Sequence, residues 1–373
     1  MTKEPFCLIE DSEAPGDLWF AGAKDFITAK TLAEVAPAFA AMQAALAEGR
    51  HLAGFFAYEC GYAFEPRLAP LLPPDGELLR FGVFDAPQRV ERIAPEKPAG
   101  VENLRADWSF ADYAPRFETC MDYLRAGDIY QVNLTFPLSG RYFGSPLDLY
   151  RTLRGRQPVA LGGVVALGQE TIVSLSPERF FTKNGQNIAV RPMKGTAPRG
   201  ATPAQDAELA AKLAADAKSR AENLMIVDLL RNDLSRLSEV GSVAVTDLFT
   251  VEAFPTLHQM TSGVEARLRP GVQLAEIFAG LFPCGSVTGA PKIRAMQIIA
   301  ELETARRGAY CGAIGHIAPN GDMRFNVAIR SLTLGRNGAL IGNVGSAIVA
   351  DSRAQEEYDE CLLKARFLGQ ISA

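Results

Sequence analysis

A lysine in a glycine-containing segment is the first residue of this sequence whose type and setting could do chemistry. Lys194 lies between Pro192 and Gly195, after the apolar run at residues 188–190. Glycine lets a ligand approach the backbone closely, and a lysine with a lowered pKa can act as a nucleophile or a base. The alternative is an exposed loop lysine without a chemical role. Taken alone, the segment favours that alternative.

A glutamate after a proline turn is the second candidate. Glu178 follows Pro177, between apolar runs at residues 171–175 and 180–181. A carboxyl group in an apolar pocket has a raised pKa and can act as a general acid. The alternative is a Glu178–Arg179 pair at the rim of the molecule with no role. When the segment is considered by itself, this alternative is the favoured one.

Three glutamates on two predicted helices form the third candidate. Glu222 lies on one helix, while Glu357, Glu360 and Lys364 share a face of another through their i, i+3, i+7 spacing. Carboxylates from two helices suit Mg²⁺, which uses one or two protein carboxylates together with water and substrate oxygens. The alternative is a surface ion pair between Glu360 and Lys364. Spacing alone leaves both interpretations open.

Two further features could bind an anion. Residues 282–291 form a Gly/Ser/Thr-rich loop that opens a predicted helix, where free N–H groups attract a carboxylate or phosphate. The spacing differs from that of a P-loop. Arg330, in a predicted strand, could hold a carboxylate through paired hydrogen bonds, although a strand arginine is more often structural. A serine–histidine–aspartate triad is not supported, because no G-x-S-x-G motif occurs.

The elements that must position these residues predict an α+β protein. The length of 373 residues indicates two domains or one large one. A proline-rich linker at residues 86–100 suggests units of 1–100 and 101–373, which are expected to intertwine in one structural unit. Non-adjacent strands mixed with long helices favour α+β over a regular βαβ repeat. Helices are predicted at 33–47, 110–126, 202–237 and 354–370, and strands at 52–58, 128–136, 171–175, 242–249, 316–318, 326–334 and 339–341.

Composition excludes several classes of protein. The chain is 48% hydrophobic and 22% charged with a net charge of −5, and no basic run indicates nucleic-acid binding. No apolar stretch is long enough to cross a membrane, and no signal peptide is visible at the start. The six cysteines are scattered without a C-x-x-C pair, so neither a zinc site nor a disulfide framework is expected. A cytoplasmic protein fits this pattern.

Taken together, the candidate segments resemble the chorismate-utilising enzymes from about residue 110 to residue 368. Six motifs occur in the order that the family has them. They are Tyr-Gln-Val-Asn-Leu at 130–134, Ser-Pro-Glu-Arg-Phe at 176–180, Pro-Met-Lys-Gly-Thr at 192–196, Ala-Glu-Asn-Leu-Met-Ile-Val-Asp-Leu-Leu-Arg-Asn-Asp at 221–233, Cys-Gly-Ser-Val-Thr-Gly-Ala-Pro-Lys-Ile-Arg-Ala-Met at 284–296 and Glu-Tyr-Asp-Glu-Cys-Leu-Leu-Lys-Ala at 357–365.

Two positions distinguish the branches of this family. Anthranilate synthases have alanine where this chain has Lys194, and isochorismate and salicylate synthases have a lysine base where it has Gln131. The combination resembles the branch that aminates chorismate at the para position. The resemblance implies that Lys194 attacks the ring, that Glu178 protonates the leaving hydroxyl with help from His258, and that ammonia then displaces Lys194 to give 4-amino-4-deoxychorismate.

The resemblance also implies a fold, a cofactor and a partner. The expected fold is two large antiparallel sheets packed as a sandwich with peripheral helices, and a glutamine amidotransferase subunit is expected to supply the ammonia. Mg²⁺ is expected on Glu222 and Glu360, with Glu357 reaching it through water. The residues expected to contact chorismate are Gln131, Gly195, Thr196, Ser286, Tyr310, Arg330, Gly345, Ala347 and Lys364.

Two other functions remain open from the sequence. One is an anthranilate synthase component, which would release pyruvate. The other is a non-catalytic binding subunit, suggested by two departures from the family pattern. Ser346 and Ala347 replace part of a glycine-rich segment, and Ser219 stands where relatives often carry an acid.

Overall fold

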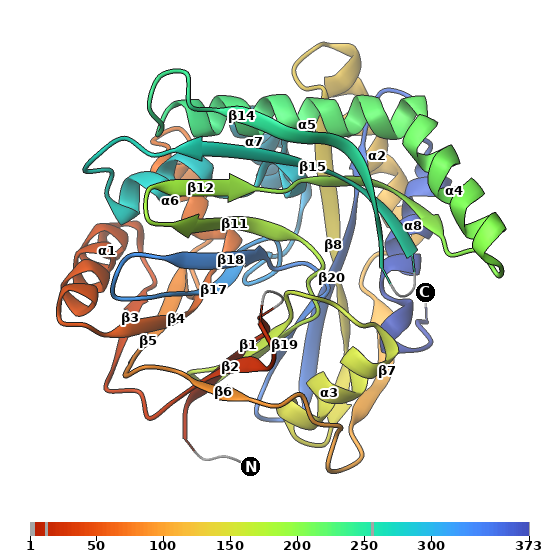
Figure 1. Cartoon of the computed structure of the whole chain (residues 1–373). Coiled ribbons are helices and arrows are strands. Elements are labelled where there is room, and N and C mark those ends of the chain that lie inside the picture. The colour runs from red at the N-terminus through yellow and green to blue at the C-terminus, as the bar shows by residue number, and fades with distance from the viewer. Residues whose placement is uncertain (1–3, 12–13, 255–256, 373) are drawn as a thin grey trace.

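Two antiparallel sheets form the framework of the protein. The computed structural model describes residues 4–11, 14–254 and 257–372, and in these residues each sheet has ten strands (Figure 1). The first sheet contains β1 (Phe6–Ile9), β2 (Asp17–Ala21), β6 (Gln88–Val90), β7 (Gly100–Ala106), β8 (Gln131–Phe143), β9 (Gly163–Ala166), β10 (Thr171–Ser174), β16 (Gly289–Ala290), β19 (Ser331–Leu334) and β20 (Ala339–Ile348).

The second sheet runs from β13 and β15 at one edge to β3 at the other, with β14 paired to β15. Its strands are β3 (Asp25–Ala29), β4 (His51–Phe56), β5 (Leu79–Phe84), β11 (Arg179–Asn184), β12 (Asn187–Val190), β13 (Met193–Pro198), β14 (Ala244–Ala253), β15 (Leu257–Arg267), β17 (Ala313–Ile317) and β18 (Met323–Val327). The α+β class and the two-sheet arrangement expected from the sequence are confirmed.

Helices cover the outer faces of the sheets. Helices α2 and α8 pack on β8 and β20, whereas α4 and α5 pack on β13 and β15, and α1 packs against α6 and β4. The helices are α1 (Leu32–Ala47), α2 (Phe110–Arg125), α3 (Pro146–Arg156), α4 (Pro203–Ala215), α5 (Ala217–Ser235), α6 (Leu274–Leu281), α7 (Lys292–Leu302) and α8 (Ala354–Lys364). No helix in the described ranges is both long enough and apolar enough to span a membrane.

The core has one cluster between the sheets and one beneath the helices. Small and aromatic side chains of the first sheet, such as Phe20 and Val165, meet Phe55 and Phe84 of the second sheet. On its other face, the second sheet buries Phe56 against Phe278 of α6, with 4.1 Å between the ring centroids. Aromatic pairs of this kind contribute beyond their buried area.

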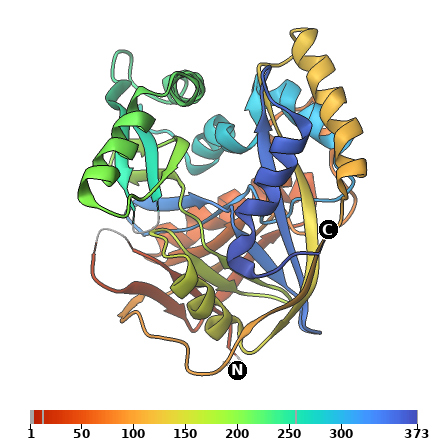
Figure 2. The same cartoon turned by 90° about the vertical axis from the view of Figure 1, so that its right-hand side faces the viewer.

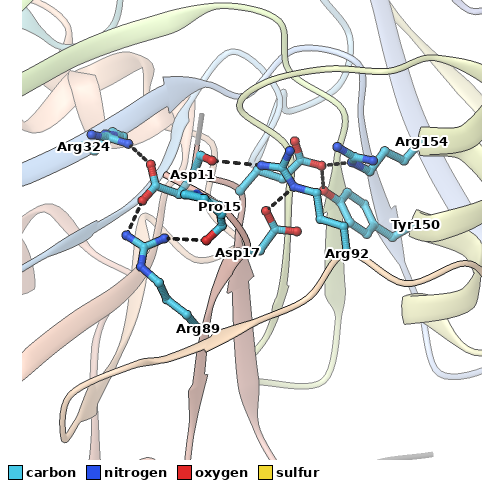
Figure 3. A network of polar contacts seen from close by, with 9 residues as sticks. Asp11, Pro15, Asp17, Arg89, Arg92, Tyr150, Arg154 and Arg324 are labelled. Carbon is cyan, nitrogen blue, oxygen red and sulfur yellow. Dashed lines mark hydrogen bonds and ion pairs between the residues drawn. The ribbon is translucent and has the colours of Figure 1, made fainter. Parts of the chain in front are cut away.

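The first hundred residues contribute strands to both sheets. Strand β1 pairs with β9, and β4 pairs with β17, so early and late parts of the chain share each sheet. Polar contacts add to this connection (Figure 3). The Asp11 carboxylate accepts hydrogen bonds from Arg89, at a distance of 2.6 Å, and from Arg324 of β18, at a distance of 2.5 Å.

Two predicted elements are each divided in the structure. The predicted helix at 202–237 is broken at Asp216, whose extended backbone (φ −66°, ψ 113°) ends α4, and whose carboxylate caps α5 by accepting from the Ser219 N–H. Asp is a preferred cap because its side chain satisfies an otherwise unpaired N–H. The predicted strand at 326–334 is β18 and β19, which lie in different sheets.

Candidate active site

A cavity of about 650 Å³ lies where the edge of the second sheet faces β20 and α8. Figure 2 shows α4 and α5, in green, on one side and α8, in dark blue, on the other. Of the residues predicted from the sequence, all but Gln131 and His258 line this cavity. They are Glu178, Lys194, Gly195, Thr196, Glu222, Ser286, Tyr310, Arg330, Gly345, Ala347, Glu357, Glu360 and Lys364.

Two crossovers between the sheets bring Glu178 and Arg330 to the cavity. The chain leaves the first sheet after β10 and returns to it before β19, and the two crossing segments are hydrogen-bonded to each other. The Val327 N–H donates to the Glu178 carbonyl, with an N···O distance of 3.0 Å. The Leu175 N–H donates to the Arg330 carbonyl at the same distance. The prediction that Arg330 lies on a strand is wrong, because its backbone has a φ of 51° between β18 and β19.

Glu178 is a buried carboxyl group with a single hydroxyl partner. It is 5% exposed, and its Oε1 accepts a hydrogen bond from Ser286 Oγ after 2.6 Å. Burial raises the pKa of Glu178, and the Ser286 hydrogen bond and the charges of Lys194 and Lys364 partly oppose that rise. The carboxyl group is therefore protonated to a higher pH than an exposed glutamate, as a general acid requires.

Lys194 has the opposite perturbation. Burial of its amine lowers the pKa of Lys194, Lys364 lowers it further, and the carboxylates of Glu222, Glu178 and Glu360 oppose this decrease. A lowered lysine pKa increases the fraction of neutral, nucleophilic amine. A lysine with a lowered pKa and a glutamate with a raised pKa in one cavity form a candidate nucleophile–acid pair, because their environments move the two pKa values in opposite directions.

Gly195 and Thr196 hold the segment that carries Lys194. Gly195 has a φ of 77°, and a Cβ atom there would lie 2.5 Å from Ser219 Oγ of α5. This glycine therefore permits the close approach of α5. It also lines the cavity, so its contact with a ligand stays a prediction. The sequence analysis did not identify Gln259. Its side-chain amide donates to the Gly195 carbonyl at a distance of 2.6 Å and accepts a hydrogen bond from Thr196 Oγ1 at 3.2 Å.

Arg330 offers a cation without a protein counter-ion. Its guanidinium makes no hydrogen bond or ion pair to another residue in the described part of the chain, and burial alone lowers the pKa of Arg330. It still remains charged at neutral pH because arginine starts from a pKa far above that range. An unpaired, partly buried guanidinium is suited to a bidentate contact with a carboxylate of a ligand. The buried Tyr310 lines the same wall.

Lys364 connects α8 with β20 at the opposite wall. Its amine donates to the Gly345 carbonyl at a distance of 2.9 Å and forms an ion pair with Glu360 at a distance of 2.7 Å. The surface ion pair that the spacing allowed is therefore present, and it lies at the cavity. Gly345 must be glycine, because a Cβ atom would lie 2.5 Å from Thr135 Cγ2 on the neighbouring strand.

The three glutamates line the cavity from α5 and α8. Within residues 4–11, 14–254 and 257–372, no three His, Cys, Asp or Glu side chains converge enough to hold a metal ion by themselves. Burial raises the pKa of Glu222, and the negative charges of Glu357 and Glu360 raise it further. These facing carboxylates therefore fit a cation that takes its remaining ligands from a bound anion and water.

Gln131 and His258 do not line the cavity. Gln131 has no exposed surface, and both its amide atoms lack a hydrogen-bond partner among the described residues. His258 is 3% exposed and its Nε2 lies 2.8 Å from Asp206 of α4. The structure thus shows no contact between His258 and Glu178 in the described residues, because α4 binds the imidazole instead. Asn133 and Lys218, which the sequence did not single out, do line the cavity.

The comparisons with known proteins agree with this fold and cavity. The chain matches the chorismate binding enzyme family over residues 4–370. It belongs to that family, as the order of its motifs predicted. The structure is similar to anthranilate synthase component I from Streptococcus pneumoniae, with a TM-score of 0.79 at 27% identity over 98% of this chain and 90% of that one.

Two similar sequences represent two branches of the family. The chain is 44% identical over 270 residues to aminodeoxychorismate synthase component 1 of Klebsiella aerogenes. The matched region covers 72% of this chain and 60% of that protein. The chain is 38% identical over 298 residues to anthranilate synthase component 1 of Thermus thermophilus, which covers 79% of this chain and 64% of that protein. The chain thus spans about 60% of the length of the former relative.

Proposed function

We propose that this chain converts chorismate and ammonia to 4-amino-4-deoxychorismate, from which a separate lyase makes p-aminobenzoate for folate biosynthesis. The observation that carries the proposal is Lys194, an amine with a lowered pKa in the same cavity as Glu178, a carboxyl group with a raised pKa. The name of the Klebsiella aerogenes relative supports the same activity.

The proposed reaction consists of two allylic displacements. The neutral amine of Lys194 attacks C2 of the ring, the double bonds shift, and the 4-hydroxyl leaves as water with a proton from Glu178. Ammonia then adds at C4, the double bonds shift back, and the Lys194 amine leaves C2. The sum is replacement of one hydroxyl by an amino group with loss of water. Direct addition at C2 without Lys194 would place the nitrogen at the wrong carbon.

Cations in the cavity would hold the two carboxylates of chorismate. Arg330 would bind the enolpyruvyl carboxylate, because its guanidinium has no competing partner in the described residues. Tyr310, Lys364 and the backbone at Gly345 and Ala347 line the same region. These local cations are needed because a protein with a net charge of −5 repels a dianion in general.

We further propose that the enzyme uses Mg²⁺. Glu222 and Glu360 would hold it directly, and Glu357, whose Oε1 already accepts from Ser352 Oγ after 2.7 Å, would reach it through water. When bound, Mg²⁺ supplies Lewis-acid polarisation of the ring carboxylate and neutralises its charge. Because Lys364 pairs with Oε1 of Glu360, the second carboxylate oxygen of Glu360 would be the one to hold the cation while the pair persists.

The ammonia would come from a glutamine amidotransferase subunit. The "component 1" in the name of the Klebsiella aerogenes relative is consistent with a second component. Free ammonium at high concentration would replace this partner in the test tube, so the chemistry of this chain is testable alone.

The deciding experiment identifies the product and the covalent adduct together. The protein is mixed with chorismate, Mg²⁺ and ammonium chloride, and the product is analysed by chromatography with and without an added lyase. In parallel, denaturing mass spectrometry searches for an adduct on the wild type and on Lys194→Ala. We expect 4-amino-4-deoxychorismate, with an adduct on the wild type and none on the variant.

Other results would identify a different function. Anthranilate with unaided release of pyruvate would assign the chain to the anthranilate synthases. No turnover, with chorismate bound, would indicate a binding subunit. Amination at the para position by Lys194→Ala at the wild-type rate would exclude the covalent route even if the overall activity is correct.

A further inference from the structure

A buried arginine outside the cavity connects two segments that contribute to its wall. Arg307, in the loop between α7 and β17, has a side chain that is 1% exposed. Its guanidinium makes a bidentate contact with Glu303, with Nη2 2.6 Å from Oε1 and Nε 2.9 Å from Oε2. It also lies 4.5 Å from the centroid of the Tyr58 ring. The charge is therefore compensated without any group from the cavity.

The remaining donors of Arg307 hold two backbone carbonyls. Nη1 donates to the Val287 carbonyl at a distance of 2.8 Å, and Nη2 donates to the Asn133 carbonyl at a distance of 2.6 Å. Glu303 continues the network, because its Oε1 accepts from the Thr135 N–H after 2.9 Å. Arg307 thus joins β8 to the short 3₁₀ helix Gly285–Val287. Only the fixed fork of arginine provides donors in all these directions.

The contact at Val287 bears directly on Glu178. Ser286 precedes Val287 in the same 3₁₀ turn, and its hydroxyl is the hydrogen-bond donor to Glu178 Oε1. The turn is further fixed by Asn133, whose Nδ2 donates to the Val287 carbonyl after 3.3 Å and whose N–H donates to the Thr288 carbonyl after 2.9 Å. A shift of Val287 would therefore move Ser286 away from the carboxyl group.

From this geometry we infer that Arg307 is a positioning residue, which keeps the Ser286 hydroxyl on Glu178 and so holds the proposed acid at the leaving group. The inference rests on the proposed function for its kinetic consequence, but the contact itself does not depend on that function. A displacement of about 1 Å in a reacting group can reduce turnover by about a hundredfold.

The experiment is a double-mutant cycle between Arg307→Lys and Ser286→Ala. Lysine keeps the charge opposite Glu303 but cannot reach both carbonyls. We expect Arg307→Lys to reduce kcat by about tenfold to a hundredfold while KM for chorismate stays within about twofold. The double variant should be no slower than the slower single variant, because both changes remove the same contact. Fully multiplicative losses, or a rise in KM at unchanged kcat, would refute the role.

The control is Arg324→Lys. Arg324 forms another largely buried ion pair, with Asp11, and it does not line the cavity. The variant should lower the melting temperature but leave kcat and KM within about twofold. If Arg307→Lys does not fold, Glu303→Gln replaces it, since glutamine preserves the shape but removes the acceptor of Nε.

A spectroscopic measurement separates this inference from the proposed reaction. Infrared difference spectra against Glu178→Gln report the carboxyl band of Glu178 in the protein without substrate. Arg307→Lys should shift that band in the same direction as Ser286→Ala, while Arg324→Lys should not. An unshifted band would reject the positioning role even if chorismate is aminated, and a shifted band would support it even if another reaction is catalysed.

Discussion

At the scale of single residues, the site contains two buried groups whose pKa values are shifted in opposite directions from those of exposed side chains. Burial is the largest cause for both, since it lowers the pKa of the Lys194 amine and raises the pKa of the Glu178 carboxyl. Charged neighbours moderate these shifts without reversing them. Each shift therefore favours the form that the proposed reaction uses.

The hydrogen bond from Ser286 predicts a pH dependence. Glu178 acts when protonated, so activity is lost as the pH rises through its pKa. The Ser286 hydroxyl stabilises the carboxylate and lowers that pKa. In Ser286→Ala, the alkaline limb of the kcat profile should therefore move to higher pH, while the maximal kcat falls. Ser331→Ala is the matched control, because that hydroxyl lines the cavity but donates to Ser174. A limb that moves to lower pH would contradict the assignment of Glu178 as the acid.

The residues of the site were largely predictable from short motifs, but their contacts were not. Glu178, Lys194 and Ser286 each lie in a motif that fixes residue type, so sequence located them. Gly195 packs against Ser219 of α5, a contact that depends on how this helix lies on the sheet. His258 has the type expected of a proton donor, yet Asp206 binds its ring. Which partner a side chain meets is decided by tertiary packing, which local spacing does not contain.

At the scale of elements, the contact between β13 and α5 determines where Lys194 and Glu222 lie relative to each other. Gly195 is a point of close approach in this contact. Asn223 of α5 also accepts a hydrogen bond from Ser262 of β15, at a distance of 2.5 Å. The helix that carries one proposed metal ligand is thus fixed to the sheet that carries the nucleophile.

Gly195→Ala should destabilise the protein for two separable reasons. The positive φ of Gly195 costs an alanine about 1 kcal/mol, and the overlap with Ser219 adds about 1–3 kcal/mol. Gly185→Ala is the matched control, because Gly185 has a φ of 58° but open space around its Cβ position. Denaturant unfolding should show the larger loss of free energy for Gly195→Ala. In a Ser219→Gly background the two losses should become similar, and an undiminished difference would contradict the steric argument.

Elements with a strong local pattern were predicted well. The helices at 110–126 and 33–47 agree with α2 and α1 to within a residue. The errors have physical causes that act over a distance. The strand predicted at 326–334 has a continuous β-rich composition, but it leaves one sheet at Val327 and enters the other at Ser331. The break at Asp216 lets α4 and α5 run in different directions while both pack on β13 and β15, and the local helical pattern does not show this requirement.

At the scale of the whole molecule, the N-terminal segment stabilises the sandwich through contacts outside the cavity. Figure 3 shows Asp11 between Arg89 and Arg324, with Arg92 contacting Asp17 and the Asp11 carbonyl. Tyr150 and Arg154 both donate to Glu10. These contacts connect β1 and β2 with α3 and with the second sheet, and none of these side chains lines the cavity.

Asp11→Asn should therefore affect stability more than activity. The change leaves Arg324, which is 16% exposed, and the more exposed Arg89 without their shared carboxylate. We expect the free energy of unfolding to fall by about 1–3 kcal/mol, with kcat within about twofold of the wild type. Asp85→Asn is the control, because its ion pairs with Lys24 and Arg50 are exposed and should contribute less than about 1 kcal/mol. Equal effects of the two variants would argue against a shared structural role of Asp11.

The paired crossovers have one further consequence. Because main-chain hydrogen bonds join the segments of Glu178 and Arg330, the spacing of these two residues does not depend on the side chains of α8. Substitutions along that helix can reshape the opposite boundary and alter which ring substituents are accepted. Substrate preference can thus diverge through positions of α8 outside the proposed metal ligands, such as Leu363, while the proposed proton source and anion receptor remain in place.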